Sequence, residues 1–304
     1  MPILLAVPIN KTNAVQTWDA ELVAEPFADF GEGPLWDEAK GVWWWTDIVG
    51  SAVHRFDPRT NSNTAIPVEH TVGTLALNTS GEVIAAAANG VGVLAPDGSV
   101  DIFAPINADD PAMRLNDGKC DAAGRLYVSS MAFAATDGAG ALLRVDTDHS
   151  VHELEGGKTI GNGLAWSADA KTFYYTDSPT RRIDAYDVDP ATGDISNRRE
   201  ILQIAEADGM PDGFCIDDEG ALWIALWGGS SVRRYSPDGE VIGEVRLPVS
   251  NVTCAAFGGD EYGELLITTA APKHSGSGAS EPLGGAMFRI RPGVTGPPPN
   301  PYRG

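Results

Sequence analysis

The sequence predicts an all-β fold, a six-bladed β-propeller with four-stranded antiparallel blades around one polar central channel. Two observations support this prediction: one short pattern recurs six times, and no long stretch keeps the apolar spacing of an amphipathic helix. The content of 35 Gly and 21 Pro also disfavours a doubly wound α/β fold. We expect a single domain over residues 1–304, with a propeller core at about 18–292 and frayed tails.

Each repeat reads as a turn residue, a β-rich run, a polar interruption and a second β-rich run that ends near a charged turn. The first repeat is GVWWWTDIVGSAVHRFDP, and we expect its tryptophans to pack in the core. The six repeats begin at Gly41, Gly81, Gly124, Lys171, Gly220 and Gly263, which are 40, 43, 47, 49 and 43 residues apart. Such a period, with several short strands per unit, is typical of propeller blades.

Both ends of the chain fall outside the six repeats. Residues 17–27 precede the first repeat, so we expect them to supply the outer strand that closes the ring against the last blade. Residues 297–299 are three consecutive prolines, and we expect this tail to be frayed.

The composition is strongly acidic. With 21 Lys and Arg against 42 Asp and Glu, the net charge of -21 would repel nucleic acid and anionic lipid, so the expected partner is neutral, cationic or a metal ion. The apolar runs are far shorter than the roughly 18 residues of a membrane helix, and no basic residue precedes the apolar run at 3–7. We therefore expect a cytoplasmic protein without a membrane span.

Several reactive residue types give no catalytic signature. Cys120, Cys215 and Cys254 are an odd number without a CxxC pair, so we expect buried free thiols rather than disulfides or a thiolate metal site. His149 and His152 have HxxH spacing but lie on a turn between strands, where an exposed pair is the expected arrangement. No G-x-S-x-G elbow and no complete P-loop occur.

Polar segments precede four of the repeats, and each mixes Gly with carboxylate or amide groups. The first strand of a blade lies beside the axis, so we expect these segments to converge at the mouth of the channel. Taken singly, Asn-Gly and Asp-Gly also fit ordinary turns, but the surface hairpins have their own turns, such as PDG at 96–98. The four segments are GEGP at 31–34, RLNDG at 114–118, GNG at 161–163 and PDG at 211–213.

Three residues of these segments offer only oxygen ligands. Glu32, Asn162 and Asp212 supply two carboxylates and one amide, the ligand set of a hard divalent cation such as Ca²⁺, Mg²⁺ or Mn²⁺, with Zn²⁺ also open. A site with three protein ligands leaves positions for water and substrate, as expected of a catalytic metal.

The same segments resemble a known family. FGEGPLWDEAKGVWWWTDI, RLNDGKCDAAGRLYVSSM, GNGLAWSADAKTFYYTDS and PDGFCIDDEGALWIALWGG are similar to the SMP-30/gluconolactonase/regucalcin family of sugar lactonases, and the likeness spans residues 25–291. The resemblance implies a six-bladed propeller with one axial divalent metal held by Glu32, Asn162 and Asp212. It also implies that Asp212 is the catalytic acid or base and that Arg114 and Asn116 contact the substrate.

The chain departs from the animal members of that family at one place. After SSM at 129–131 those members carry acidic residues that reach the substrate, whereas residues 132–135 here read AFAA. Phrases such as ALWGGSSVRRYSPDG look more like bacterial aldonolactonases. We therefore expect hydrolysis of an aldonolactone to the aldonic acid in bacterial oxidative sugar catabolism.

Two other functions remain open at this stage. A metal that polarises C=O can also polarise P=O, so the same site could serve a phosphotriesterase-like or other ester hydrolase. A non-catalytic calcium-binding or protein-docking propeller is a use from a different class. The residues also leave open whether Asp212 or a metal-bound water is the working base, because a carboxylate on a dication has a lowered pKa.

Overall fold

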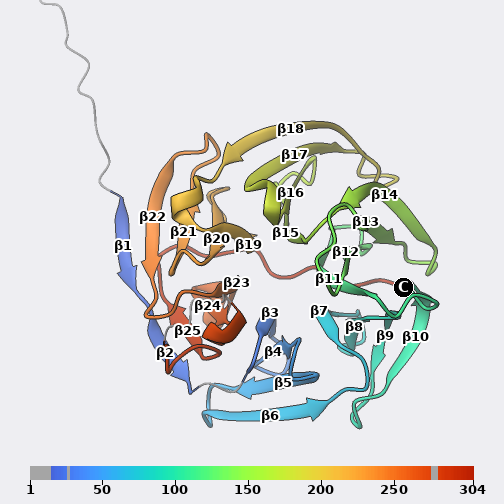
Figure 1. The fold of residues 1–304 in the computed structure, drawn as a ribbon, viewed down its shortest axis with the longest axis horizontal. Coiled ribbons are helices and arrows are strands. Elements are labelled where there is room, and N and C mark those ends of the chain that lie inside the picture. Colours follow the sequence, from blue (N-terminus) through green and yellow to red (C-terminus); the bar gives the residue numbers. More distant parts are fainter. Residues whose placement is uncertain (1–14, 26–27, 275–279) are drawn as a thin grey trace, which may run out of the picture.

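The fold is a ring of six β-sheets around a central axis, as the sequence predicts (Figure 1). The computed structural model describes residues 15–25, 28–274 and 280–304. Helical structure in these ranges is limited to four short 3-10 turns, η1 (Ser178–Thr180), η2 (Glu206–Asp208), η3 (Asp260–Tyr262) and η4 (Pro272–His274). None of these helices is long and apolar enough to cross a bilayer.

The first three blades each run from the axis outward in sequence order. Blade 1 contains β3 (Gly31–Asp37), β4 (Val42–Asp47), β5 (Ala52–Asp57) and β6 (Ser62–Pro67). Blade 2 contains β7 (Val72–Leu77), β8 (Val83–Ala87), β9 (Gly90–Leu94) and β10 (Val100–Pro105). Blade 3 contains β11 (Met113–Cys120), β12 (Leu126–Ala132), β13 (Gly140–Val145) and β14 (Val151–Lys158).

The other three blades repeat this order, and the last is completed from the N-terminal side of the chain. Blade 4 contains β15 (Gly161–Trp166), β16 (Thr172–Asp177), β17 (Arg182–Val188) and β18 (Ile195–Gln203). Blade 5 contains β19 (Met210–Ile216), β20 (Leu222–Trp227), β21 (Ser231–Tyr235) and β22 (Val241–Arg246). Blade 6 contains β23 (Val252–Gly258), β24 (Glu264–Thr269), β25 (Met287–Ile290) and β2 (Glu21–Ala24).

Residues 17–27 were expected to supply the outer strand that closes the ring against the last blade, and part of this segment does so. Strand β2 pairs antiparallel with β25 and removes the open edge of blade 6. Strand β1 (Gln16–Asp19) instead pairs in parallel with β22 and gives blade 5 a fifth strand, which the repeats do not predict. Residues 26–27 of the predicted segment, and the tail at 1–14, lie outside the described residues.

Every inner strand carries a β-bulge. The ladder register shifts between Glu32 and Leu35, Val72 and Thr74, Leu115 and Gly118, Asn162 and Leu164, Pro211 and Phe214, and Val252 and Cys254. A bulge sets two residues against one on the partner strand and re-aims side chains out of the alternation. The four polar segments lie at four of these bulges, so the inner strands turn their polar groups toward the axis.

The core consists of apolar side chains packed between neighbouring blades. Trp43, Trp44 and Trp45 of β4 are all buried, as expected from their β-rich run. The three cysteines are buried free thiols, which also agrees with expectation.

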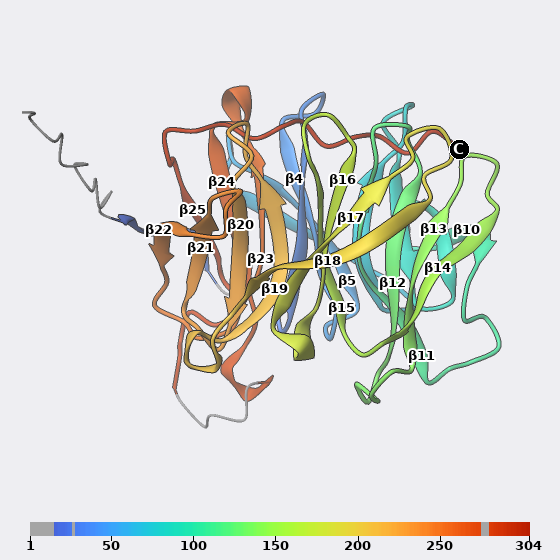
Figure 2. The ribbon, with the colours of Figure 1, turned by 90° about the horizontal axis from the view of Figure 1, so that it is seen from above.

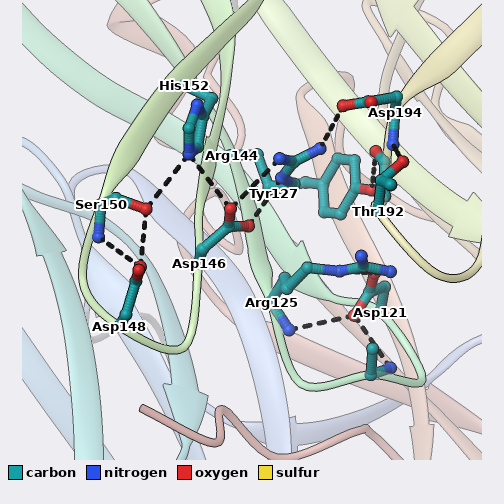
Figure 3. Close-up of polar contacts among 12 residues, drawn as sticks. Asp121, Arg125, Tyr127, Arg144, Asp146, Asp148, Ser150, His152, Thr192 and Asp194 are labelled. Atoms are coloured by element: carbon teal, nitrogen blue, oxygen red, sulfur yellow. Dashed lines mark hydrogen bonds and ion pairs between the residues drawn. The ribbon is translucent and has the colours of Figure 1, made fainter.

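A polar network joins blade 3 to the hairpin that follows β17 in blade 4 (Figure 3). Arg144 bonds Asp146 at 2.6 Å and Asp194 at 2.9 Å, and the Tyr127 hydroxyl donates to the Gly193 carbonyl at 2.5 Å. His152 bonds Asp146 and Ser150 (Figure 3).

The two histidines of the HxxH pair have different environments. His149 stacks on Phe103 with ring centroids 4.3 Å apart, while His152 belongs to the polar network described above. Both histidines are exposed, as expected, and they contact different groups.

The C-terminal tail is ordered, contrary to the prediction of a frayed end. It crosses the centre of the ring in Figure 1 and runs along one face of the disc in Figure 2. Tyr302 is 0% exposed, its backbone N–H donates to the Leu77 carbonyl at 2.7 Å, and its hydroxyl donates to the Asp146 carbonyl at 2.7 Å. Burial of this aromatic ring fixes a segment whose prolines cannot donate backbone hydrogen bonds.

Candidate active site

The five residues singled out from the sequence lie on four inner strands around the axis. Glu32 is on β3, Arg114 and Asn116 are on β11, Asn162 is on β15 and Asp212 is on β19. The structure brings all five together through hydrogen bonds or direct electrostatic interaction.

Neighbouring inner strands are joined at the level of their bulges. Thr253 donates to the Gly31 carbonyl at 2.6 Å, Thr74 donates to the Gly118 carbonyl at 3.1 Å, and the Asn116 amide donates to the Gly161 carbonyl at 2.9 Å. The bulge glycines are also tightly packed. Gly163 has φ +42, and a Cβ there would lie 2.0 Å from the Phe214 ring, so only glycine fits.

Arg114 and Asn116 form the polar wall of the site on blade 3. An Arg114 guanidinium nitrogen donates to the Asn116 side-chain oxygen at 2.6 Å and to the Leu115 carbonyl at 3.1 Å. Burial lowers the pKa of Arg114 to about 10, while the charges of Glu32 and Asp212 act to raise it. The guanidinium therefore keeps its charge at neutral pH.

Glu32 and Asp212 form a buried carboxyl pair, 5% and 6% exposed. Burial is the main cause that raises the pKa of Glu32 well above its ordinary value, and the charges of Asp212 and Asp117 add to it. Burial and then the charge of Asp117 likewise raise the pKa of Asp212. The Gly33 N–H donates to a Glu32 oxygen at 2.9 Å, which partly offsets the burial.

Asp117 is a site residue to which the sequence analysis gave no role. It is buried, the Gly118 N–H donates to it at 2.8 Å, and burial raises its pKa against the lowering effect of the Lys119 charge. In regular alternation, only one of Asn116 and Asp117 would face the axis. The bulge between Leu115 and Gly118 allows both to do so, and that irregularity is not readable from the sequence pattern.

Two aspartates at the ends of second strands position the loops that lead into the site. Asp177 accepts hydrogen bonds from the Ile160 N–H at 2.8 Å and from the Thr159 N–H. Asp47 accepts hydrogen bonds from the N–H groups of Asp29 and Phe30, each at 2.9 Å. These contacts fix the backbone just before Asn162 and Glu32, so the candidate ligands lie on rigid supports.

The residue types fit a hard divalent cation. Two buried carboxylates that repel each other in their ionised forms would be stabilised by a dication, and Asn162 adds a neutral amide oxygen. Across the described ranges, no group of three His, Cys, Asp or Glu side chains is placed to hold a metal ion. Any ion at this place would therefore depend on Asn162 as well as on Glu32 and Asp212.

The mouth of the site is partly aromatic. Phe30, just before β3, stacks on Trp227 at the end of β20 with ring centroids 5.3 Å apart. On blade 3 the Arg114 guanidinium lies 6.0 Å from the centroid of the Phe133 ring, which is 53% exposed. Residues 132–135 thus contribute one buried alanine and one exposed ring beside Arg114.

Comparisons with known proteins agree with this architecture. Residues 30–271 match the family model described as the SMP-30/gluconolactonase/LRE-like region. Regucalcin of Xenopus laevis is 36% identical over 93% of this chain and 98% of its own length. YvrE of Bacillus subtilis, named as a candidate sugar lactone lactonase, is 36% identical over 94% of this chain and 99% of its own length.

A solved structure shows the same fold along nearly the whole chain. The calcium-binding protein regucalcin of Agrobacterium tumefaciens superimposes with a TM-score of 0.88 at 27% identity, over 95% of this chain and 99% of that one.

Proposed function

Because this chain belongs to the SMP-30/gluconolactonase/LRE-like family, we propose that it hydrolyses a sugar lactone, an aldonolactone, to the aldonic acid with the aid of one divalent metal ion. The supporting observation is the buried pair of Glu32 and Asp212 beside the cationic Arg114 and the Asn116 amide. The proposed setting is bacterial oxidative sugar catabolism.

Glu32, Asn162 and Asp212 would hold the metal, and their oxygen donors suit Ca²⁺, Mg²⁺, Mn²⁺ or Zn²⁺. When bound, the ion supplies a Lewis acid that polarises the lactone carbonyl. The orientation of the Asn162 amide follows from Arg114, which can only donate and therefore faces the Asn116 side-chain oxygen. The Asn116 nitrogen then donates to the Asn162 oxygen at 3.1 Å, which leaves the Asn162 nitrogen to donate to the Ser178 hydroxyl at 3.0 Å.

Arg114 and Asn116 would orient the substrate. The guanidinium holds the Asn116 side-chain oxygen at 2.6 Å and has further N–H groups for sugar hydroxyls or the carbonyl oxygen. Because the pair is tied to the β11 backbone through the Leu115 carbonyl, little conformational freedom is lost when the substrate binds.

Asp212 would transfer the proton in the reaction. Water adds to the carbonyl carbon, the bond to the ring oxygen breaks, and one proton passes from the attacking water to the leaving oxygen. Asp212 can accept that proton directly or relay it. Burial and the charge of Asp117 raise its pKa, and a dication bound to the carboxylate would lower it again.

A screen of metals against substrates tests the proposal. Metal-free protein is reloaded with each of the four cations and assayed for acid release on gluconolactone, galactonolactone, xylonolactone and arabinonolactone. Turnover that depends on one cation supports the proposal. Turnover only on a phosphotriester or an unrelated ester would place the activity in another class of hydrolase.

A calcium-binding propeller without catalysis is the second candidate, favoured by the names of the regucalcin relatives. Tight calcium binding with no turnover of any lactone or ester in the same screen would support that function instead.

A further inference from the structure

Lys119 joins two inner strands that are not adjacent in the ring. Its ammonium group, on β11 of blade 3, donates to the Phe214 carbonyl of β19 in blade 5 at 3.0 Å. Strand β15 of blade 4 lies between these two strands around the axis (Figure 1). The three bonds between inner strands described above each join neighbouring blades. The Lys119 bond, in contrast, links β11 to β19 directly.

The acceptor of this bond belongs to the bulge that carries Asp212. The register shift in β19 lies between Pro211 and Phe214, so the Phe214 backbone forms one end of that bulge. Because a bulge leaves a residue outside the regular ladder, the direction of its side chains depends on how the two ends are fixed. Phe214 is fully buried, and Lys119 holds its carbonyl group. The position of the Asp212 carboxylate is thus linked to Lys119.

The same bulge packs against the strand that carries Asn162. A Cβ atom on Gly163 would lie 2.0 Å from the Phe214 ring and 2.8 Å from the Asp212 carbonyl oxygen. Only glycine fits at such distances, so the bulges of β15 and β19 are in close contact. A shift of the Phe214 backbone would therefore also displace Gly163 and, through it, Asn162.

Asp117 supports this arrangement from the same strand as Lys119. The two residues are both on β11, and their charges interact. Burial raises the pKa of Asp117, while the charge of Lys119 and backbone hydrogen bonds from Gly118 and Gly163 act to lower it. Asp117 thus contacts the residue that follows Asn162, while Lys119 holds the end of the neighbouring bulge. One stretch of β11 therefore fixes both of these bulges.

We propose that Lys119 is a positioning residue for the candidate metal site, because it holds the bulges of β15 and β19 at the separation at which Asn162 and Asp212 bind one ion. This inference rests on the proposed function. The Lys119 ammonium has no lone pair to offer, so it is not itself a ligand. Its role is to reduce the conformational freedom that the ligands lose when the ion binds.

Lys119 has two effects on ion binding, and they have opposite signs. As a positive charge near the carboxyl groups it repels a dication, so electrostatics alone predicts that its removal strengthens ion binding. As a support for the strand that carries Asp212, it favours ion binding, and its removal weakens it. A variant without the ammonium group therefore distinguishes a positioning role from a purely electrostatic one.

Titration calorimetry of the metal-free full chain with Mn²⁺ measures ion affinity without any lactone turnover. We expect Lys119→Met to bind Mn²⁺ about tenfold more weakly than the unchanged protein does, since a charged hydrogen bond is lost. Lys119→Arg keeps a charged donor and should restore most of the affinity. The exposed Lys171 provides the matched control, and Lys171→Met should bind Mn²⁺ as the unchanged protein does.

Two further variants keep the test decisive. Tyr302→Ala loses a buried ring of the C-terminal tail, so its free energy of unfolding should fall while its Mn²⁺ affinity is kept. If Lys119→Met does not fold, Lys119→Gln takes its place. The glutamine amide nitrogen ends on a shorter stem and does not reach the Phe214 carbonyl at the same distance, so Mn²⁺ binding should still weaken several-fold.

The outcomes separate this inference from the proposed function. Equal or tighter Mn²⁺ binding by the folded Lys119 variant would overturn the positioning role and leave the metal site standing. A loss of affinity in Tyr302→Ala as large as that in the Lys119 variant would also overturn it, because general destabilisation would then be the cause. Absence of saturable Mn²⁺ binding in the unchanged protein would overturn the metal site itself, and this inference with it.

Discussion

The Asn116 side-chain nitrogen lies 3.1 Å from the Asn162 side-chain oxygen, although the two residues are 46 positions apart. This bond joins a residue proposed to orient the substrate to one proposed to hold the metal. A change at either position is therefore expected to affect the other, and the variants below are designed with that coupling in view.

Removing the Asp212 carboxylate tests the metal site. We expect one divalent ion per chain in the unchanged protein, and loss of both ion and lactone hydrolysis in Asp212→Ala, because a three-ligand site would lose one of its two charges. Elemental analysis after gel filtration measures the ion. The exposed Asp101→Ala is the matched control, and stoichiometric metal with undiminished turnover in Asp212→Ala would contradict the assignment.

Asn116→Ala separates substrate binding from metal binding. The variant should keep the metal at saturating concentration, with somewhat weaker affinity because the bond to Asn162 is lost. Its kcat/KM on sugar lactones should fall by about 10 to 100-fold, equivalent to a lost hydrogen bond of about 1 to 3 kcal/mol. An equal fall on a lactone without hydroxyl groups would argue against a role in orienting the sugar.

The apolar stretch at 132–135 bears on substrate choice. Without the acidic residues of the animal relatives, this wall offers Phe133 and alanines, so it should distinguish poorly between sugars that differ by one hydroxymethyl group, by about 10 to 200-fold at most. Both pentonolactones and hexonolactones should then be hydrolysed. A preference above about 10⁴ for one lactone in steady-state kinetics would show that other polar residues recognise the sugar.

The carboxyl pair predicts how the stability of the metal-free protein depends on pH. Burial raises the pKa of both Glu32 and Asp212 above their ordinary values of 4.5 and 3.8. When the pH rises past these ordinary values, the two groups lose their protons in the unfolded state but keep them in the folded state, until the pH reaches the raised pKa values. The free energy of unfolding should therefore be highest at low pH, as far as this pair contributes, and fall as pH rises.

Urea denaturation in the presence of a chelator measures this dependence. Glu32→Gln removes one titrating group, and its stability should fall less with rising pH than that of the unchanged protein. Saturating metal should also flatten the profile, because the dication stabilises the ionised pair. If the free energy of unfolding fell equally with rising pH in Glu32→Gln and in the unchanged protein, the raised pKa of Glu32 would be contradicted.

Tyr302 should contribute strongly to stability even though it is third from the C-terminal end. Tyr302→Ala removes a fully buried ring and the hydrogen bond from its hydroxyl to the Asp146 carbonyl, so we expect a loss of about 3 kcal/mol or more by urea denaturation. Pro298→Ala in the same tail is the control and should change stability by less than about 0.5 kcal/mol. Similar stability of both variants would mean that the tail is dispensable.

The sequence by itself determined the number and order of the blades and which segments face the channel. Each repeat encodes its own hairpins through short-range turn chemistry and apolar alternation, and the polar segments precede four of these hairpins at a constant place. Because these signals act within a few residues, the polar segments with Glu32, Asn162 and Asp212 could be singled out before any contact between them was known, whereas Arg114 and Asn116 were selected through the family resemblance.

Tertiary structure alone decided the relationships between distant parts of the chain. The parallel addition of β1 to blade 5, the burial of Tyr302 and the orientation of Asp117 toward the axis have no local sequence signal. The same holds for the bond between Lys119 and the Phe214 carbonyl, which are 95 positions apart. The physical reason is that ring closure and β-bulges bring together strands as far apart as Thr253 and Gly31, 222 positions from each other, whereas turn and alternation patterns describe only neighbours.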